Sequence, residues 1–175
     1  NGLYADFSPK PIAGEAGNGL HINISLQGRE ESVSQAFMAG ILCHIREMTA
    51  FLNPCEASYR RLGEKKAPRY VTWSHQNRSQ LIRIPAAQGQ YRRMELRSAD
   101  PSVNPYLAFA LIIFAGLDGV KRGLTPPEPT NINLYTAGPA VTENLEVLPG
   151  SLSEAKRMAR ESDFIRSVLP EEMLE

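Results

Sequence analysis

The sequence predicts an α+β fold, in which strands and helices follow one another without the regular alternation of a parallel α/β protein. Residues 20–26 and 93–97 alternate apolar with polar side chains, the period-two pattern typical of a half-buried strand. Residues 32–52 carry apolar side chains at spacings of three and four, and residues 106–120 are apolar almost throughout. These patterns favour a small sheet packed against long helices.

Length and composition predict a single domain over residues 1–175. Of these residues, 42% are hydrophobic and 22% are charged, which is ordinary for a globular chain with a sizeable core. The net charge of zero argues against a general attraction to nucleic acids or membranes. The longest apolar run, residues 106–117, is shorter than the roughly 18 residues that a membrane span takes. Cys43 and Cys55 are expected to be free thiols in the cytoplasm.

The first elements are an extended segment, a glycine loop and a strand. Residues 1–10 end at prolines, which exclude a helix, and residues 14–19 contain three glycines. On its own this loop is more typical of a plain turn than of a backbone that approaches a ligand closely. The strand at residues 20–26 places His21, Asn23 and Ser25 on one polar face. A structural role and a binding role for that face remain equal alternatives.

The first long helix is predicted over residues 32–52. Ser32 and Gln35 have the spacing of a capping box, His44 and Cys43 fall on or near the buried side, and Asn53 with the next proline ends the helix. Residues 53–66 are polar and irregular with clustered basic side chains, which indicates an exposed loop or a mobile flap. Residues 71–74 and 80–85 are predicted strands.

The second half of the chain is predicted to be mainly helical. Asn104 and Pro105 start a helix that Gly123 ends, and its apolar character on nearly every side predicts a buried helix. Residues 125–149 form a proline-rich connector and a loop. Ser151 and Glu154 form another capping box, which begins short helices over residues 152–160 and 163–169.

Residues 77–97 concentrate positive charge, with five arginines and one acid, Glu95. The alternation puts Arg93, Glu95 and Arg97 on one face of a strand. Guanidinium groups repel each other unless an anion lies among them, and their fork fits phosphate and carboxylate oxygens. The stretch is therefore either a polyanion pocket with Glu95 available to a metal, or a solvated face of mixed charges. The alternation alone favours the solvated face.

Several short motifs together carry a resemblance over residues 7–175. They are Pro9-Lys10-Pro11, Gly17-Asn18-Gly19-Leu20-His21, Asn53-Pro54, Ser58-Tyr59-Arg60-Arg61-Leu62, Asn77-Arg78-Ser79, Ile82-Arg83-Ile84-Pro85, Arg93-Met94-Glu95-Leu96-Arg97, and Asp100-Pro101 followed by Asn104-Pro105-Tyr106-Leu107-Ala108. In order and spacing they resemble the C-terminal part of the glutamine synthetase catalytic domain. The resemblance implies an antiparallel, curved sheet packed on helices, with a helical C-terminal region.

The resemblance also implies an activity. Family members ligate glutamate and ammonia to glutamine: ATP phosphorylates the γ-carboxylate, and ammonia then displaces phosphate. They belong to nitrogen metabolism, use magnesium or manganese, and form ring-shaped homo-oligomers in which a neighbouring subunit completes the site. The residues implied for metal binding are His21 and Glu95, and the carboxylate of Glu95 suits a hard cation.

The resemblance further implies residues for both substrates. Ser25 would lie near the nucleotide, while Arg78, Arg83 and Arg93 would hold its phosphates. Arg78 and Arg83 would also be catalytic, because phosphoryl transfer asks mainly for cations around spread negative charge. The residues implied for glutamate binding are Gly17, Arg61 and Arg97.

Three positions depart from the family pattern, at Ala16, Asn23 and Lys66. Ala16 stands where the glycine loop of the family has Asn, and Asn23 stands where its strand has a second His. Lys66 replaces the Glu that takes a proton from ammonia in the family, and a charged lysine accepts no proton. Glu64 could substitute only if the loop shifts. Ammonia and an organic amine therefore remain alternative second substrates.

The family's other metal-binding carboxylates come from strands that precede this segment. We therefore expect the 175 residues alone to be inactive and to bind metal weakly. A non-catalytic relative kept for assembly or regulation is a further alternative, and the neutral charge argues against a nucleic-acid-binding module. Tyr135 falls near a tyrosine that is adenylylated in some bacterial members, but a plain exposed tyrosine is the interpretation that we favour.

Overall fold

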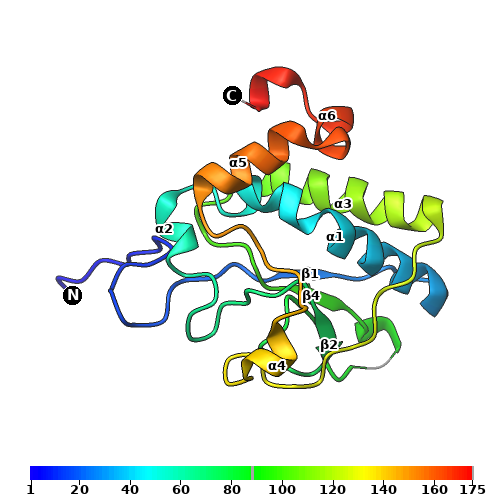
Figure 1. Ribbon diagram of the computed structural model, residues 1–175, viewed down its shortest axis with the longest axis horizontal. Helices are drawn as coiled ribbons and strands as arrows, with labels where there is room; N and C mark the ends of the chain where they lie inside the picture. Colours follow the sequence, from blue (N-terminus) through cyan, green and yellow to red (C-terminus); the bar gives the residue numbers. More distant parts are fainter. Residues whose placement is uncertain (88, 175) are drawn as a thin grey trace.

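The computed structural model describes residues 1–87 and 89–174, without the side chain of Gln90, and its centre is a four-stranded sheet. The strand order is β1-β4-β3-β2. Figure 1 shows helices α1 and α3 on one side of this sheet, with α5 and α6 stacked over them. The strands are β1 (Ile22–Ile24), β2 (Trp73–His75), β3 (Ile82–Ile84) and β4 (Met94–Leu96).

The α+β class is confirmed, but the prediction of a wholly antiparallel sheet is wrong for one pair. Strands β1 and β3 both run antiparallel to β4, whereas β2 and β3 are parallel. The polar loop between β2 and β3 folds back on itself, because the Asn77 side chain accepts hydrogen bonds from Ser79 and donates one to the carbonyl of Ile132. The chain therefore re-enters the sheet beside the start of β2.

Two long helices carry most of the core. The helices are α1 (Glu31–Leu52), α2 (Glu56–Tyr59), α3 (Pro105–Arg122), α4 (Pro139–Thr142), α5 (Leu152–Glu161) and α6 (Asp163–Val168), with 3-10 turns at η1 (Gly89–Tyr91) and η2 (Glu171–Met173). Helix α1 packs on α3 and on α5, and the C-terminal region is helical as predicted. None of the described helices has the length and apolar character needed to cross a membrane.

Local capping signals place most helix ends. Asn104 Oδ1 accepts from the backbone of Tyr106 at 3.0 Å, and Gly123 adopts a left-handed φ of 63° at the other end of α3. Ser151 Oγ accepts from the backbone of Glu154 at 3.1 Å, as its capping box predicts. The predicted capping box at Ser32 is wrong, because the N-cap is Glu30 and Ser32 lies two residues after it, inside the first turn of the helix.

Helices α1 and α3 approach each other at glycines. A Cβ on Gly40 would lie 2.1 Å from the carbonyl oxygen of Ala115, and one on Gly119 would lie 2.2 Å from that of Ala36. The ring of Phe37 packs directly over Gly116. The two backbones therefore touch, and no larger residue fits between them.

The prediction that α3 is buried on nearly every side is wrong. Its inner face is buried in the core, with Leu111 and Ala115 at 0% exposure. Its outer face leaves large apolar side chains exposed, because α1 packs against only one side of the helix. The exposed residues are Tyr106, Phe109, Ile113, Phe114 and Leu117.

His44 joins three helices, as its predicted burial requires, whereas Cys43 beside it is exposed rather than buried. The His44 Nε2 lies 2.8 Å from a carboxylate oxygen of Asp118 on α3, and its Nδ1 lies 3.2 Å from one of Glu47. The imidazole also stacks on Phe164 of α6 at 3.9 Å. Only the protonated ring donates from both nitrogens at once.

The His44 contacts predict that stability falls as pH rises. Burial lowers the pKa of His44, but the hydrogen bonds to Glu47 and Asp118 outweigh burial and raise the pKa above its ordinary value. A raised folded-state pKa contributes stability that is complete below about pH 6 and is lost as pH passes through that pKa. We expect the stability difference between wild type and His44→Gln, measured by urea unfolding, to shrink as the pH rises from about 6 to about 8.5. A difference that grows with pH would contradict this.

Candidate active site

Three neighbouring strands place polar side chains together on one face of the sheet. Asn23 on β1 and Arg83 on β3 are both register partners of Glu95 on β4. Register partners point to the same face of a sheet, so the three side chains lie in a row across it. The alternation of the arginine stretch therefore does build a shared face, with Glu95 at its centre.

Glu95 is the anion among these cations, and it is only 5% exposed. Its Oε2 accepts from Arg83 Nε at 2.6 Å, and its Oε1 accepts from Arg97 Nη1 at 3.0 Å. His21 Nδ1 lies 2.7 Å from the same Oε1. Burial raises the pKa of Glu95, but Arg83 and Arg97 outweigh it and lower that pKa, so the carboxylate is charged at neutral pH.

A pocket of about 630 Å³ opens over this cluster. It brings together seven of the nine residues that the sequence proposes for the site, from five separate stretches of the chain. These residues are Gly17, His21, Arg61, Arg78, Arg83, Glu95 and Arg97. Lys65, Lys66 and Tyr135 also line the pocket and were not among the proposed site residues.

Arg61 forms one buried wall of the pocket, and it is 3% exposed. Its Nη2 donates to Asn53 Oδ1 at 3.0 Å and to the carbonyl of Ser98, while its Nε has no hydrogen-bond partner among the described residues. Gly17 packs against this side chain, and a Cβ there would lie 2.3 Å from the carbonyl of Pro9 and 2.8 Å from Arg61 Cγ. The glycine is therefore needed to let the loop reach the arginine.

The loop after α2 presents lysines to the pocket. Glu64, the acid of this loop, pairs with the Nζ of Lys10 at 2.6 Å, and the same Nζ donates to the carbonyl of Glu15. The residues that follow Glu64 line the pocket instead, with Lys65 in a left-handed conformation at φ 54°. Glu64 is thus held by the N-terminal segment and is absent from the described pocket lining.

Tyr135 is exposed, as expected, but it also lines the pocket. It is 36% exposed, and its hydroxyl donates to the carbonyl of Arg78 at 3.0 Å. Its loop is attached to the β2–β3 connection, because the side chains of Asn77 and Gln80 both donate to the carbonyl of Ile132. No local pattern reveals this contact, since it joins segments more than 50 residues apart.

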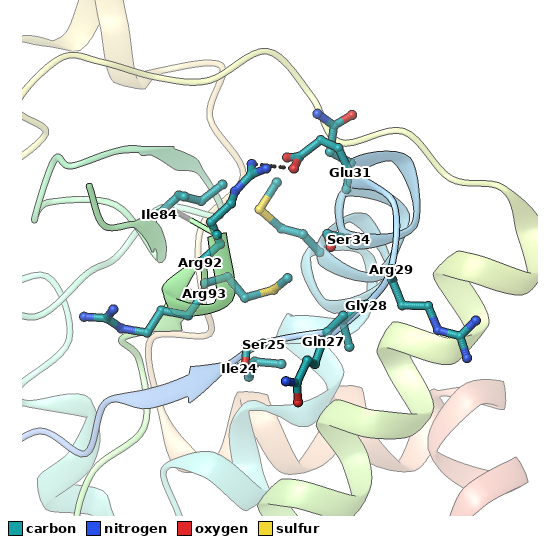
Figure 2. Close-up of a pocket in the computed structure, with 15 residues that line it drawn as sticks. Ile24, Ser25, Gln27, Gly28, Arg29, Glu31, Ser34, Ile84, Arg92 and Arg93 are labelled. Atoms are coloured by element: carbon teal, nitrogen blue, oxygen red, sulfur yellow. Dashed lines mark ion pairs between the residues drawn. The ribbon is translucent and has the colours of Figure 1, made fainter. Parts of the chain in front are cut away.

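Ser25 and Arg93 do not line this pocket but a neighbouring one of about 300 Å³, shown in Figure 2. Figure 2 shows Arg92 extending toward Glu31, with which it forms an ion pair, while Arg93 extends in another direction. Arg93 Nε donates to Asn23 Oδ1 at 3.0 Å. Asn23 is the register partner of Glu95, so this hydrogen bond joins a residue that lines the smaller pocket to the row that contains Glu95.

His21 and Glu95 fit one half of a divalent-cation site. Burial and then Arg97 lower the pKa of His21, which favours the neutral imidazole that a metal requires. A hard cation takes about six ligands, mainly oxygens. Among the described residues, no group of three or more His, Cys, Asp or Glu side chains could hold a metal ion, so the remaining ligands would have to come from elsewhere.

Comparison with known proteins agrees with this geometry. A family model described as glutamine synthetase, catalytic domain, matches residues 1–175. The chain belongs to the glutamine synthetase family. Glutamine synthetases of Methanosarcina mazei and Pyrococcus abyssi are each 43% identical to it over 97% and 98% of the chain, and that of Staphylococcus aureus is 41% identical over 95%.

Solved structures show the same fold. A GmaS/ADP complex superposes with a TM-score of 0.83 at 32% identity over 95% of the chain, and ligand-free GmaS gives 0.82 at 32% identity. The chain spans 42% of the length of the first two glutamine synthetases and 41–42% of the GmaS chains. It is therefore a part of a glutamine synthetase fold, as its resemblance to the family predicts.

Proposed function

We propose that the full-length protein containing this chain uses ATP to phosphorylate the γ-carboxylate of glutamate and then ligates it to ammonia or to an organic amine. The observation that supports this most strongly is the convergence of four arginines on one pocket around a buried carboxylate. Such a pocket suits a reaction whose substrates carry phosphate and carboxylate groups. The four arginines are Arg61, Arg78, Arg83 and Arg97.

Glutamate would bind against the buried wall of the pocket. Among the described residues, the Nε atoms of Arg61 and Arg97 have no hydrogen-bond partner, and a bound carboxylate would satisfy these donors. Gly17 lies against Arg61 and would bring backbone close to the substrate amino group. These three residues form our proposed glutamate site.

ATP would extend over both pockets. Arg78 and Arg83 would stabilise the charge on the transferred phosphoryl group, and Arg93 would hold the other phosphates of ATP. Ser25 in the neighbouring pocket would lie near the nucleoside. The hydrogen bond between Arg93 and Asn23 supports this order, because it joins a residue of the smaller pocket to the register partner of Glu95.

His21 and Glu95 would hold magnesium or manganese. When bound, the cation neutralises charge on the phosphate oxygens. The other ligands would come from parts of the protein beyond this chain, and a neighbouring subunit of a ring homo-oligomer would complete the site. We therefore expect the 175 residues alone to be inactive. We also propose that the full-length protein acts in the cytoplasm.

The nucleophile has two candidates. Ammonia is the expected one, since the curated relatives are named glutamine synthetase. An organic amine is favoured by the loop lysines, Lys65 and Lys66, which line the pocket while Glu64 is paired with Lys10. A non-catalytic relative fits poorly, because selection for assembly alone gives no reason to gather the arginines in one pocket.

Hydroxylamine tests the shared first step, because it traps an acyl phosphate as a hydroxamate. We expect the full-length protein to form γ-glutamyl hydroxamate only when ATP and glutamate are both present. Arg83→Gln should lower kcat by about 10²–10³, the usual effect of removing one electrostatic contact to a transition state, and Arg83→Lys should lower it less. Arg157→Gln, an exposed change on α5, is the control. Absence of glutamate-dependent hydroxamate would contradict the proposal.

A further inference from the structure

The charge of the pocket bears on which amine enters it. Its lining contains six cationic side chains, and Glu95 is the one acid that the described residues contribute to it. The part of the pocket that this chain forms therefore attracts anionic groups. The six cationic residues are Arg61, Lys65, Lys66, Arg78, Arg83 and Arg97.

Glu95 already has partners within the site. Both of its oxygens already accept hydrogen bonds from guanidinium groups, one from Arg83 and one from Arg97. His21 also lies 2.7 Å from one of these oxygens. The single negative charge in the described lining is thus taken up by its own neighbours and by the proposed metal ion, and it offers little attraction to an ammonium group.

The loop over the pocket adds positive charge and removes negative charge. The acid of this loop is Glu64, and its carboxylate is paired at 2.6 Å with Lys10 of the N-terminal segment. Lys10 is itself fixed, because its side chain is 6% exposed and donates to the carbonyl of Glu15 at 2.6 Å. Lys65 and Lys66 remain over the pocket, where their flexible ammonium groups can reach an anion.

We propose that the second substrate is an amine that carries its own carboxylate, as an amino acid does, and that Lys65 and Lys66 bind this carboxylate. The inference rests on the proposed function, since it names the nucleophile of that reaction. The neutral amine attacks the γ-carbonyl carbon of γ-glutamyl phosphate, the carbon–oxygen bond to phosphate breaks, and the leaving phosphate takes the proton. The products are a γ-glutamyl amide and hydrogen phosphate, and no carboxylate base from the loop is needed.

The experiment compares nucleophiles with the full-length protein, ATP and glutamate. The panel contains hydroxylamine, ammonium, ethanolamine, β-alanine and the common amino acids, with phosphate release and mass spectrometry as readouts. We expect the best amino acid to exceed ammonium and ethanolamine at least tenfold in kcat/KM. The double variant Lys65→Ala, Lys66→Ala should raise the KM for that amino acid at least tenfold more than the KM for hydroxylamine, and the matched arginine variant should restore it. Lys121→Ala, an exposed change on α3, is the control.

The outcomes separate this inference from the function on which it rests. If hydroxamate forms but ammonium or ethanolamine is the best nucleophile, or no amino acid is ligated, the inference is wrong while the ligase function stands. If the double variant affects hydroxylamine and the amino acid equally, the lysines do not bind the carboxylate and the inference is also wrong. If no hydroxamate forms, both are wrong.

Discussion

Replacing Gly40 with alanine is expected to destabilise the chain by at least about 3 kcal/mol, the upper range for overpacking a core. The added Cβ would lie 2.1 Å from the carbonyl oxygen of Ala115 and 2.7 Å from the backbone nitrogen of Gly119. Both are backbone atoms, so α1 and α3 would have to move apart. Helix propensity alone predicts that the substitution stabilises the chain, because alanine is a better helix former than glycine by about 1 kcal/mol.

Urea unfolding of the 175-residue chain measures this effect. The matched control is Gly150→Ala, because a Cβ there meets only a carboxylate oxygen of Glu154 at 3.7 Å, an ordinary contact distance. We expect that variant to remain within about 0.5 kcal/mol of wild type, as surface changes usually do. Equal stability of Gly40→Ala and wild type would show that the two helices are not in backbone contact.

Glu95→Gln should have the second large effect, on stability and on activity together. The amide keeps the shape of the carboxylate but leaves the buried Arg97 and the nearby Arg83 without their counter-charge. Breaking a buried ion pair by removing one partner costs about 3–5 kcal/mol. In the full-length protein, hydroxamate formation should also fall by about 10²–10³, because the proposed metal site loses its carboxylate.

Glu161→Gln is the control for this substitution, because its ion pair with Arg157 lies at the surface with both side chains more than 60% exposed. Exposed pairs contribute about 0–1 kcal/mol. A Glu95→Gln variant as stable as the control would mean that Glu95 does not compensate the arginines. Unfolding curves in urea for the chain, and the hydroxamate assay for the full-length protein, make the two comparisons.

The parts of the fold that the sequence predicted well have local causes. The caps at Asn104, Gly123 and Ser151 depend on contacts within one helical turn, and each lies where its motif indicates. The period-two alternation also predicts which residues of a single strand share a face, as with Glu95 and Arg97, which lie two residues apart and are hydrogen-bonded. Local physics is enough for these features, because the interacting groups are neighbours in the chain.

The features that were missed depend on contacts between distant segments. The parallel pairing of β2 with β3 and the position of Tyr135 both follow from the attachment of residues 77–80 to the carbonyl of Ile132. Glu64 is turned away from the pocket by Lys10, 54 residues earlier in the chain. The apolar pattern of α3 could not show which of its faces α1 would cover, because a helix that is apolar on nearly every side has no distinct buried face.

Oxygen transfer from glutamate to phosphate tests the central claim most directly. The full-length protein is given ATP, an amine, and glutamate labelled with 18O in its γ-carboxylate, and the released phosphate is analysed by mass spectrometry. A γ-glutamyl phosphate intermediate carries one labelled oxygen into each phosphate, because the carbon–oxygen bond breaks when the amine attacks. The predicted result is one labelled oxygen in each released phosphate. Release of unlabelled phosphate together with a γ-glutamyl amide would contradict it.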